Sequence, residues 1–158
     1  MASVLISYFS KSGNTKEMAQ CIKEGVDALR DVDVSLKKVQ ETGIDDLRSS
    51  DGIIIGSPTY FGVMAAEVKV LMDKSIQCYG KLVGKVGGGF TSSGMIGGGN
   101  ETTIMSIIEG LLIHGMIVQG VQEGNHYGPV SIGAPDEAVR GECVQYGKMI
   151  GKLVKRLI

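Results

Sequence analysis

Short apolar runs alternate along this chain with segments whose apolar residues recur at helical spacing. The runs have the length and continuity of buried parallel strands, and the segments between them have the periodicity of amphipathic helices. The pattern predicts strands over 4–9, 32–36, 53–56, 83–90 and 116–118. It predicts helices over about 14–29, around 68–72, over 104–112 with Asn100 as the N-cap, and from about 135 to 157.

Strands that alternate with helices form right-handed βαβ units around a parallel sheet. Five strands in 158 residues suit the order 2-1-3-4-5, with the sheet between two helical layers, so we expect a three-layer αβα sandwich and one domain over residues 1–158. In this architecture ligands bind beyond the carboxyl ends of the strands, at the switch point between strands 1 and 3. A functional site should therefore lie after Phe9, Gly56 and Phe90.

Composition and charge argue against several classes of function. The net charge of −1 gives no reason to expect a nucleic-acid partner or an anionic membrane surface, and no apolar run approaches the roughly 20 residues of a membrane span. The first residues resemble folded sequence rather than a signal peptide, which favours a cytoplasmic protein. Cys21, Cys78 and Cys143 lie far apart, so we expect reduced, buried thiols and no metal site.

The first of the three loops is rich in small polar residues. It offers hydroxyl groups, an amide and a glycine turn directly before a helix, whose N-terminus carries a partial positive charge. These groups suit a phosphate monoester, although an ordinary capped turn has a similar composition. The predicted phosphate-binding residues are Ser10, Lys11, Ser12, Gly13, Asn14 and Thr15, with Lys11 free to face solvent.

The second and third loops suit a flat ring. Tyr60 and Phe61 are adjacent aromatics at a strand end, where a planar ligand would explain their exposure, although they could also pack on the sheet. The glycines and serines after Phe90 can bring backbone N–H groups to the edge of a heterocycle, although the segment could be a plain surface loop. The residues predicted to contact the ring are Pro58, Thr59, Tyr60, Phe61, Gly62, Thr91, Ser92, Ser93, Gly94 and Gly97.

A phosphate, a short polar tether and a planar ring together describe FMN. A receiver domain of similar fold is excluded, because it needs carboxylates after the first and third strands and this chain has none there. A phosphate-binding module without flavin stays open as an alternative.

At this point the chain resembles the flavodoxin-like superfamily, and within it the WrbA-type NAD(P)H:quinone oxidoreductases. The segments that carry the resemblance are 10–15, 56–62, 90–94, 97–102, 114–116 and 127–128. The resemblance implies an FMN oxidoreductase that takes electrons from NAD(P)H and reduces quinones or similar acceptors, as a homodimer or homotetramer. Ile113 stands where the family commonly has a ring-contacting histidine, and there is no tryptophan. A flavodoxin that carries electrons between redox proteins is therefore the alternative.

Two histidines are candidates for roles of their own. His114 lies at the end of a predicted helix, where a histidine commonly satisfies the last carbonyls, so we expect a structural role. His126 follows the predicted fifth strand and could reach the flavin from its own or a neighbouring subunit, which makes it a weak catalytic candidate.

Overall fold

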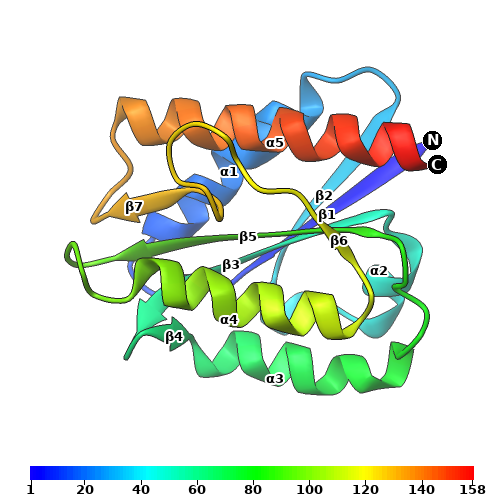
Figure 1. Cartoon of the computed structure of the whole chain (residues 1–158), viewed down its shortest axis with the longest axis horizontal. Helices are drawn as coiled ribbons and strands as arrows, with labels where there is room; N and C mark the ends of the chain where they lie inside the picture. Colours follow the sequence, from blue (N-terminus) through cyan, green and yellow to red (C-terminus); the bar gives the residue numbers. More distant parts are fainter.

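A computed structural model describes residues 1–158, and it has one sheet between two layers of helices (Figure 1). The strands are β1 (Ala2–Tyr8), β2 (Val32–Lys38), β3 (Gly52–Tyr60), β4 (Val63–Met64), β5 (Val86–Ser93), β6 (Ile117–Val118) and β7 (Val130–Ile132). The α-helices are α1 (Asn14–Asp27), α2 (Ile44–Ser49), α3 (Ala66–Lys74), α4 (Asn100–Ile113) and α5 (Glu137–Leu157). Two short 3₁₀ helices are η1 (Val39–Glu41) and η2 (Ser75–Cys78).

The sheet confirms the predicted strand order. Its path is β2-β1-β3-β5-β6, and every pair along this path is parallel. Because β1, β3 and β5 are neighbours, their carboxyl ends lie side by side at one edge of the sheet. The three loops of interest follow these strands, so the topology brings them together.

Strand alternation divides the apolar residues between two cores. Val4 and Ile6 face α1 and α5, whereas Leu5, Ile53 and Ile55 face α3 and α4. Figure 1 shows α1 and α5 on one face of the sheet and α3 and α4 on the other. Because both faces of the central strands are buried, these strands appear in the sequence as continuous apolar runs.

The fifth strand predicted over 116–118 is present as β6, but a second strand that was not predicted shares its position. The fifth position is shared by β6, which pairs with the start of β5, and β7, which pairs with its end. Between them the chain leaves the sheet over 119–129. The hydroxyl group of Tyr146 accepts the N–H of Gly89 there, at 3.1 Å, and a Cβ on Gly128 would lie 2.1 Å from the Gly89 carbonyl oxygen. A side chain and a close backbone approach thus replace strand pairing at the centre of β5.

Several boundaries also differ from the prediction. β3 and β5 extend to Tyr60 and Ser93, because Ser57 and Pro58 pair with Thr91 and Ser92. Residues expected in loops are therefore strand residues. α2 and β4 were not predicted, since elements this short show no periodicity. Val83, expected in a strand, precedes β5 and is exposed.

Glycines allow α1 and α5 to pack very closely. A Cβ on Gly25 would lie 2.0 Å from the Val144 carbonyl oxygen, and one on Gly147 would lie 2.1 Å from that of Ile22. These helices therefore touch through their backbones, which fixes α1 against α5.

The thiols of Cys21, Cys78 and Cys143 are free and buried, as expected. Burial raises the pKa of all three thiols, most strongly that of Cys143. No helix of the structure is both long enough and apolar enough to cross a membrane.

Candidate functional site

The three predicted loops are joined by hydrogen bonds between hydroxyl groups. Thr15 Oγ1, in the first turn of α1, lies 2.8 Å from Ser92 Oγ near the end of β5. Thr59 Oγ1 lies 2.9 Å from Thr91 Oγ1, which donates to the carbonyl oxygen of Ser57 at 2.7 Å. Thr15, Thr91 and Ser92 are buried, so these residues support the site from below and do not present free hydroxyl groups on its surface.

The first loop leaves the N-terminus of α1 open. Gly13 is the residue before the helix, its φ is +103°, and no side chain caps the helix. Ser10 Oγ accepts the N–H of Gly13 at 3.1 Å, which holds the turn. Lys11, Ser12 and Gly13 are exposed. The unpaired N–H groups of the first helical turn therefore face an exposed, polar loop, as anion binding requires.

The second loop is a tight hairpin with a strained tip. Tyr60 pairs with Val63, so Phe61 and Gly62 form a two-residue turn, and their φ angles are +50° and +80°. Positive φ at both positions is the geometry of a type I′ turn, which favours Asn-Gly rather than a bulky residue first. Phe61 is nevertheless there, with its side chain fully exposed. Strain of this kind costs about 1–3 kcal/mol, and strained residues cluster at active sites and ligand-binding positions.

The third loop approaches the hairpin through its glycines. A Cβ on Gly99 would lie 2.5 Å from the Cα of Gly62, so the third loop has no room for a side chain at this contact. Gly94 and Gly97 are exposed beside it. The expectation that Asn100 caps α4 was wrong, because Gly99 is the N-cap, with φ +103°, and Asn100 is the first helical residue. Like α1, α4 therefore begins without a side-chain cap.

The predicted cofactor residues thus form two groups. The exposed or half-buried residues form a surface at the carboxyl ends of the strands, which we call the rim. They are Ser10, Lys11, Ser12, Gly13, Asn14, Pro58, Thr59, Tyr60, Phe61, Gly62, Ser93, Gly94 and Gly97. The buried ones tie the rim together. The hydroxyl pairs were not foreseen from the sequence, because they join residues up to 77 positions apart and only the strand register aligns them.

The two histidines differ in their surroundings. His114 is buried directly after α4, and its Nε2 lies 2.7 Å from Ser75 Oγ, so its partner is a hydroxyl group rather than the expected carbonyls. Burial lowers the pKa of His114. His126 is exposed, and its Nδ1 donates to the carbonyl oxygen of Val121 at 2.9 Å. It lies in the loop before β7, beside a hollow lined by Glu101 and Tyr127, and its catalytic role stays a prediction.

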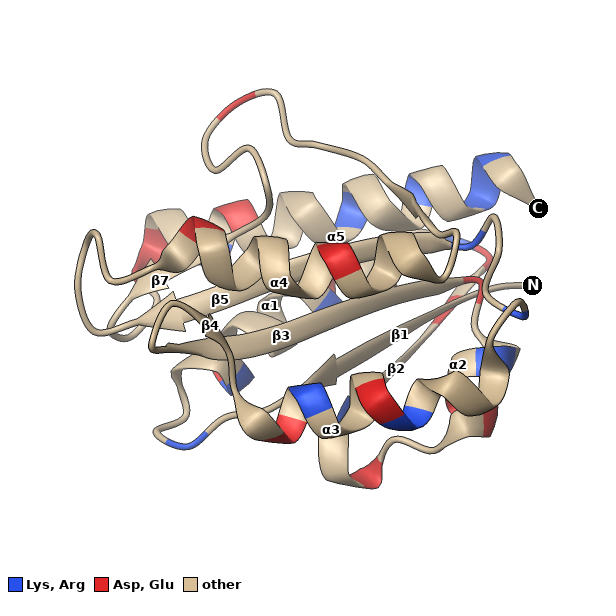
Figure 2. Ribbon diagram, turned by 60° about the horizontal axis from the view of Figure 1, so that its bottom comes forward, with Lys and Arg blue, Asp and Glu red and all other residues tan.

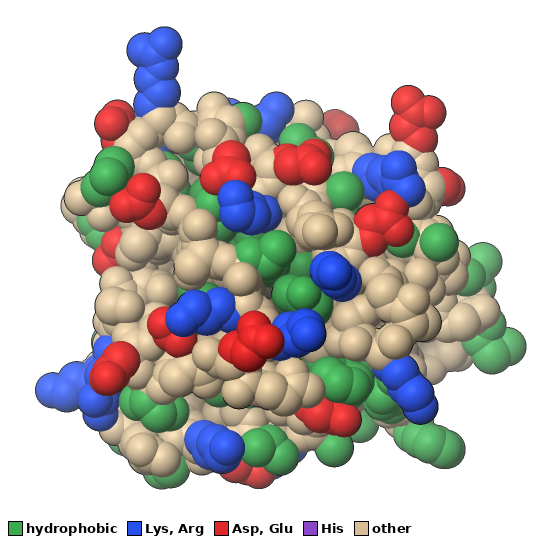
Figure 3. All heavy atoms as spheres, turned by 180° about the vertical axis from the view of Figure 1, so that it is seen from behind, with side chains coloured by type: hydrophobic (Ala, Val, Ile, Leu, Met, Phe, Trp, Pro, Cys, Tyr) green, Lys and Arg blue, Asp and Glu red, His purple; other side chains and the backbone are tan.

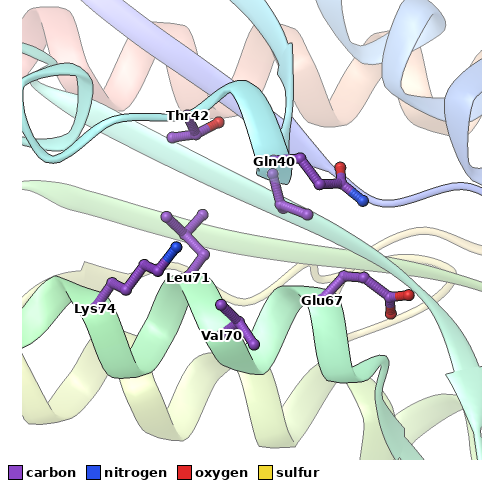
Figure 4. Close-up of a pocket in the computed structure, with 7 residues that line it drawn as sticks. Gln40, Thr42, Glu67, Val70, Leu71 and Lys74 are labelled. Atoms are coloured by element: carbon purple, nitrogen blue, oxygen red, sulfur yellow. The ribbon is translucent and has the colours of Figure 1, made fainter.

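A separate hollow of about 240 Å³ lies between η1 and α3. In Figure 4 Gln40 and Thr42 lie on one side of it, and Glu67, Val70, Leu71 and Lys74 lie on α3 opposite. None of the predicted cofactor residues lines this hollow. It is therefore distinct from the rim formed by the three loops.

Charged side chains are mixed over the surface. A local acidic patch was conceivable around Asp45, Asp46 and Asp51. Asp45 pairs with Arg48, Asp46 pairs with Lys37, and the carboxylate of Asp51 accepts hydrogen bonds from Ser3. The helix α2, which carries Asp45 and Asp46, lies at the end of the sheet away from the three loops (Figure 2). Basic and acidic side chains also alternate over the face shown in Figure 3. The structure therefore has no acidic patch around these aspartates.

Comparison with known proteins agrees with this geometry. The family model of the flavodoxin domain matches residues 5–94. A flavodoxin of Aquifex aeolicus is 36% identical, and the alignment covers 98% of this chain and 88% of that protein. An NAD(P)H dehydrogenase (quinone) of Archaeoglobus fulgidus is 32% identical, with 98% and 96% covered. The solved structure of a flavodoxin, WrbA-like protein from Agrobacterium tumefaciens matches the whole of both chains with a TM-score of 0.87, at 24% identity. Because the family model matches more than half of the chain and these relatives align over nearly all of it, the chain belongs to the flavodoxin family.

Proposed function

We propose that this chain binds FMN at the rim formed by the three loops and uses it to transfer electrons from NADH or NADPH to a quinone or similar acceptor. The single observation that carries the proposal is the uncapped N-terminus of α1 at Gly13, which the Thr15–Ser92 hydrogen bond joins to the end of β5. A phosphate group there would receive N–H groups that no other part of the chain satisfies. Relatives named flavodoxin and NAD(P)H dehydrogenase (quinone) support the same chemistry.

The remaining residues of the rim fit the rest of this cofactor. Tyr60 and Phe61 offer exposed aromatic surface to a planar ring, and Gly94 and Gly97 let backbone approach its edge. When bound, the flavin supplies the electron transfer itself, and the protein supplies binding, orientation and electrostatics. No side chain is assigned as a proton donor, and His126 is kept as the candidate to test.

A flavodoxin that passes electrons between proteins is the second candidate. It is favoured by the relative of that name, which is 36% identical. It is disfavoured by the charges, because Asp45 and Asp46 are paired and lie far from the rim, so they offer no steering field for a basic partner near the cofactor.

An anaerobic titration separates the two candidates. The FMN-loaded protein is mixed with NADH or NADPH while the flavin absorbance is followed, and dithionite serves as the positive control. Rapid bleaching by a nicotinamide supports the reductase, and adding a quinone should then restore the absorbance. Bleaching by dithionite alone supports the carrier. A protein that takes up no FMN contradicts both.

A further inference from the structure

The interrupted fifth strand creates a cavity that the cofactor site does not use. Residues 119–129 arch away from the sheet beside α5 (Figures 1 and 2). A cavity of about 320 Å³ lies between this arch and the helix. Its lining comes from both: Val121, Glu123 and Pro129 from the arch, and Glu142, Gln145, Tyr146 and Met149 from α5.

The arch is held in place by its own hydrogen bonds. The N–H of Val121 donates to the carbonyl oxygen of His126 at 2.9 Å, and His126 Nδ1 donates back to the Val121 carbonyl at 2.9 Å. Both carboxylate oxygens of Glu142 accept from the amide of Asn125, at 3.0 Å each. The cavity is therefore formed before any ligand arrives, and a ligand would not have to order the loop.

The lining combines apolar walls with negative charge. Val121, Pro129, Met149 and the ring of Tyr146 supply the walls, whereas Glu123 and Glu142 supply two carboxylates and no lysine or arginine is present. Glu123 takes part in none of the ion pairs of the structure. An unpaired carboxylate favours an organic cation, and an aromatic ring favours the same ligand, whereas the methionine adds an adaptable apolar wall.

From these features we infer that the cavity is a second ligand site, which binds a small amphipathic cation such as an aromatic amine. The apolar part of the ligand lies against Val121, Pro129 and Met149, and its ammonium group lies near Glu123 and Glu142. The volume is at the lower end of the range for small-molecule sites, which limits the ligand to about one ring with a short chain. This inference is independent of the proposed flavin chemistry.

The test compares 2-phenylethylammonium with 2-phenylethanol, a neutral molecule of nearly the same shape, in an NMR titration of the full-length chain with and without FMN. We expect the ammonium compound to shift the amide signals of 121–129 and 142–149, and to bind about fivefold more tightly than the alcohol. Glu123→Gln should remove most of that preference. Glu137→Gln, an exposed change in the first turn of α5 outside the cavity, should leave it unchanged.

Four results would overturn the inference: no shifts with the ammonium compound, shifts centred elsewhere, equal binding of the two compounds, or equal effects of the two substitutions. The last would show that net charge alone attracts the cation. Because Glu123 is exposed, its replacement by the similar glutamine should not disturb folding. The unfolding midpoint of each variant checks this directly.

Discussion

The hydroxyl groups of Thr15 and Ser92 lie 2.8 Å apart in the interior, and they join the first turn of α1 to the end of β5. Replacing Ser92 with alanine leaves the Thr15 hydroxyl buried without this partner. We expect the free energy of unfolding to fall by about 1–2 kcal/mol. Urea denaturation measures this loss, and an unchanged midpoint would contradict a supporting role for the pair.

Ser12 should behave in the opposite way, because it is exposed and its hydroxyl has no partner in the protein. Ser12→Ala should leave the unfolding midpoint nearly unchanged and weaken FMN binding by about tenfold, since a hydrogen bond to a charged phosphate is lost. Riboflavin has no phosphate and serves as the control ligand. If both ligands lose the same affinity, Ser12 does not contact the phosphate.

Phe61 should show a conflict between stability and binding. Phe61→Asn places the favoured Asn-Gly pair in the type I′ turn, so the protein without FMN should gain about 1 kcal/mol of unfolding free energy. FMN affinity should fall about fivefold, because an aromatic surface beside the ring is lost. Thermal unfolding and fluorescence quenching of FMN report the two effects. A stabilised protein with unchanged affinity would remove Phe61 from the cofactor site.

The α1–α5 contact gives a prediction with a matched control. Gly25→Ala places a methyl group 2.0 Å from the Val144 carbonyl oxygen, so the helices must separate, and we expect a loss of about 3 kcal/mol in urea denaturation. Gly141→Ala lies in α5 with nothing within 4 Å. It should raise stability by about 0.5–1 kcal/mol. Similar effects of the two changes would show that the contact is looser than described.

His114 should make stability depend on pH. Ser75 Oγ donates to the carbonyl of Met72 at 2.6 Å, so His114 Nε2 must be the donor to Ser75, and Nδ1 is the site of protonation. Nδ1 is buried without a partner. The folded protein therefore binds the proton less readily than the unfolded chain, whose histidine pKa is near 6.5.

His114 therefore contributes fully to the free energy of unfolding above about pH 6.5. This contribution is lost as the pH falls from about 6.5 toward the lower pKa of His114 in the folded protein. We expect the urea midpoint of His114→Gln to change less between pH 7 and pH 5 than the midpoint of the natural chain does. Equal slopes in the variant and the natural chain would contradict the assignment.

Periodicity was sufficient to predict the layers and the strand order, because Leu5 and Ile6 alternate between two cores and the last helix has a continuous apolar stripe. It could not predict the split fifth strand, since β6 and β7 have two and three residues and depend on Tyr146 from a distant helix. The edge of the sheet at which the three segments meet was predicted correctly, although residues 57–60 and 91–93 belong to β3 and β5 rather than to loops. The burial of Thr15 and Ser92 was not foreseen, because a hydroxyl group that binds a ligand and one that joins a helix to a strand look the same in sequence.

The contact between Tyr146 and Gly89 also bears on how the protein behaves when it is concentrated. β5 has no full-length neighbour on its outer side, and the exposed border of a sheet invites a strand from another molecule. Here the N–H of Gly89 donates to the hydroxyl group of Tyr146, and Gly128 packs closely against the carbonyl oxygen of Gly89. The middle of that border therefore cannot pair with a strand of another molecule. The chain therefore leaves its last strand incomplete without presenting a free backbone N–H group or an accessible carbonyl at Gly89, in the middle of this border.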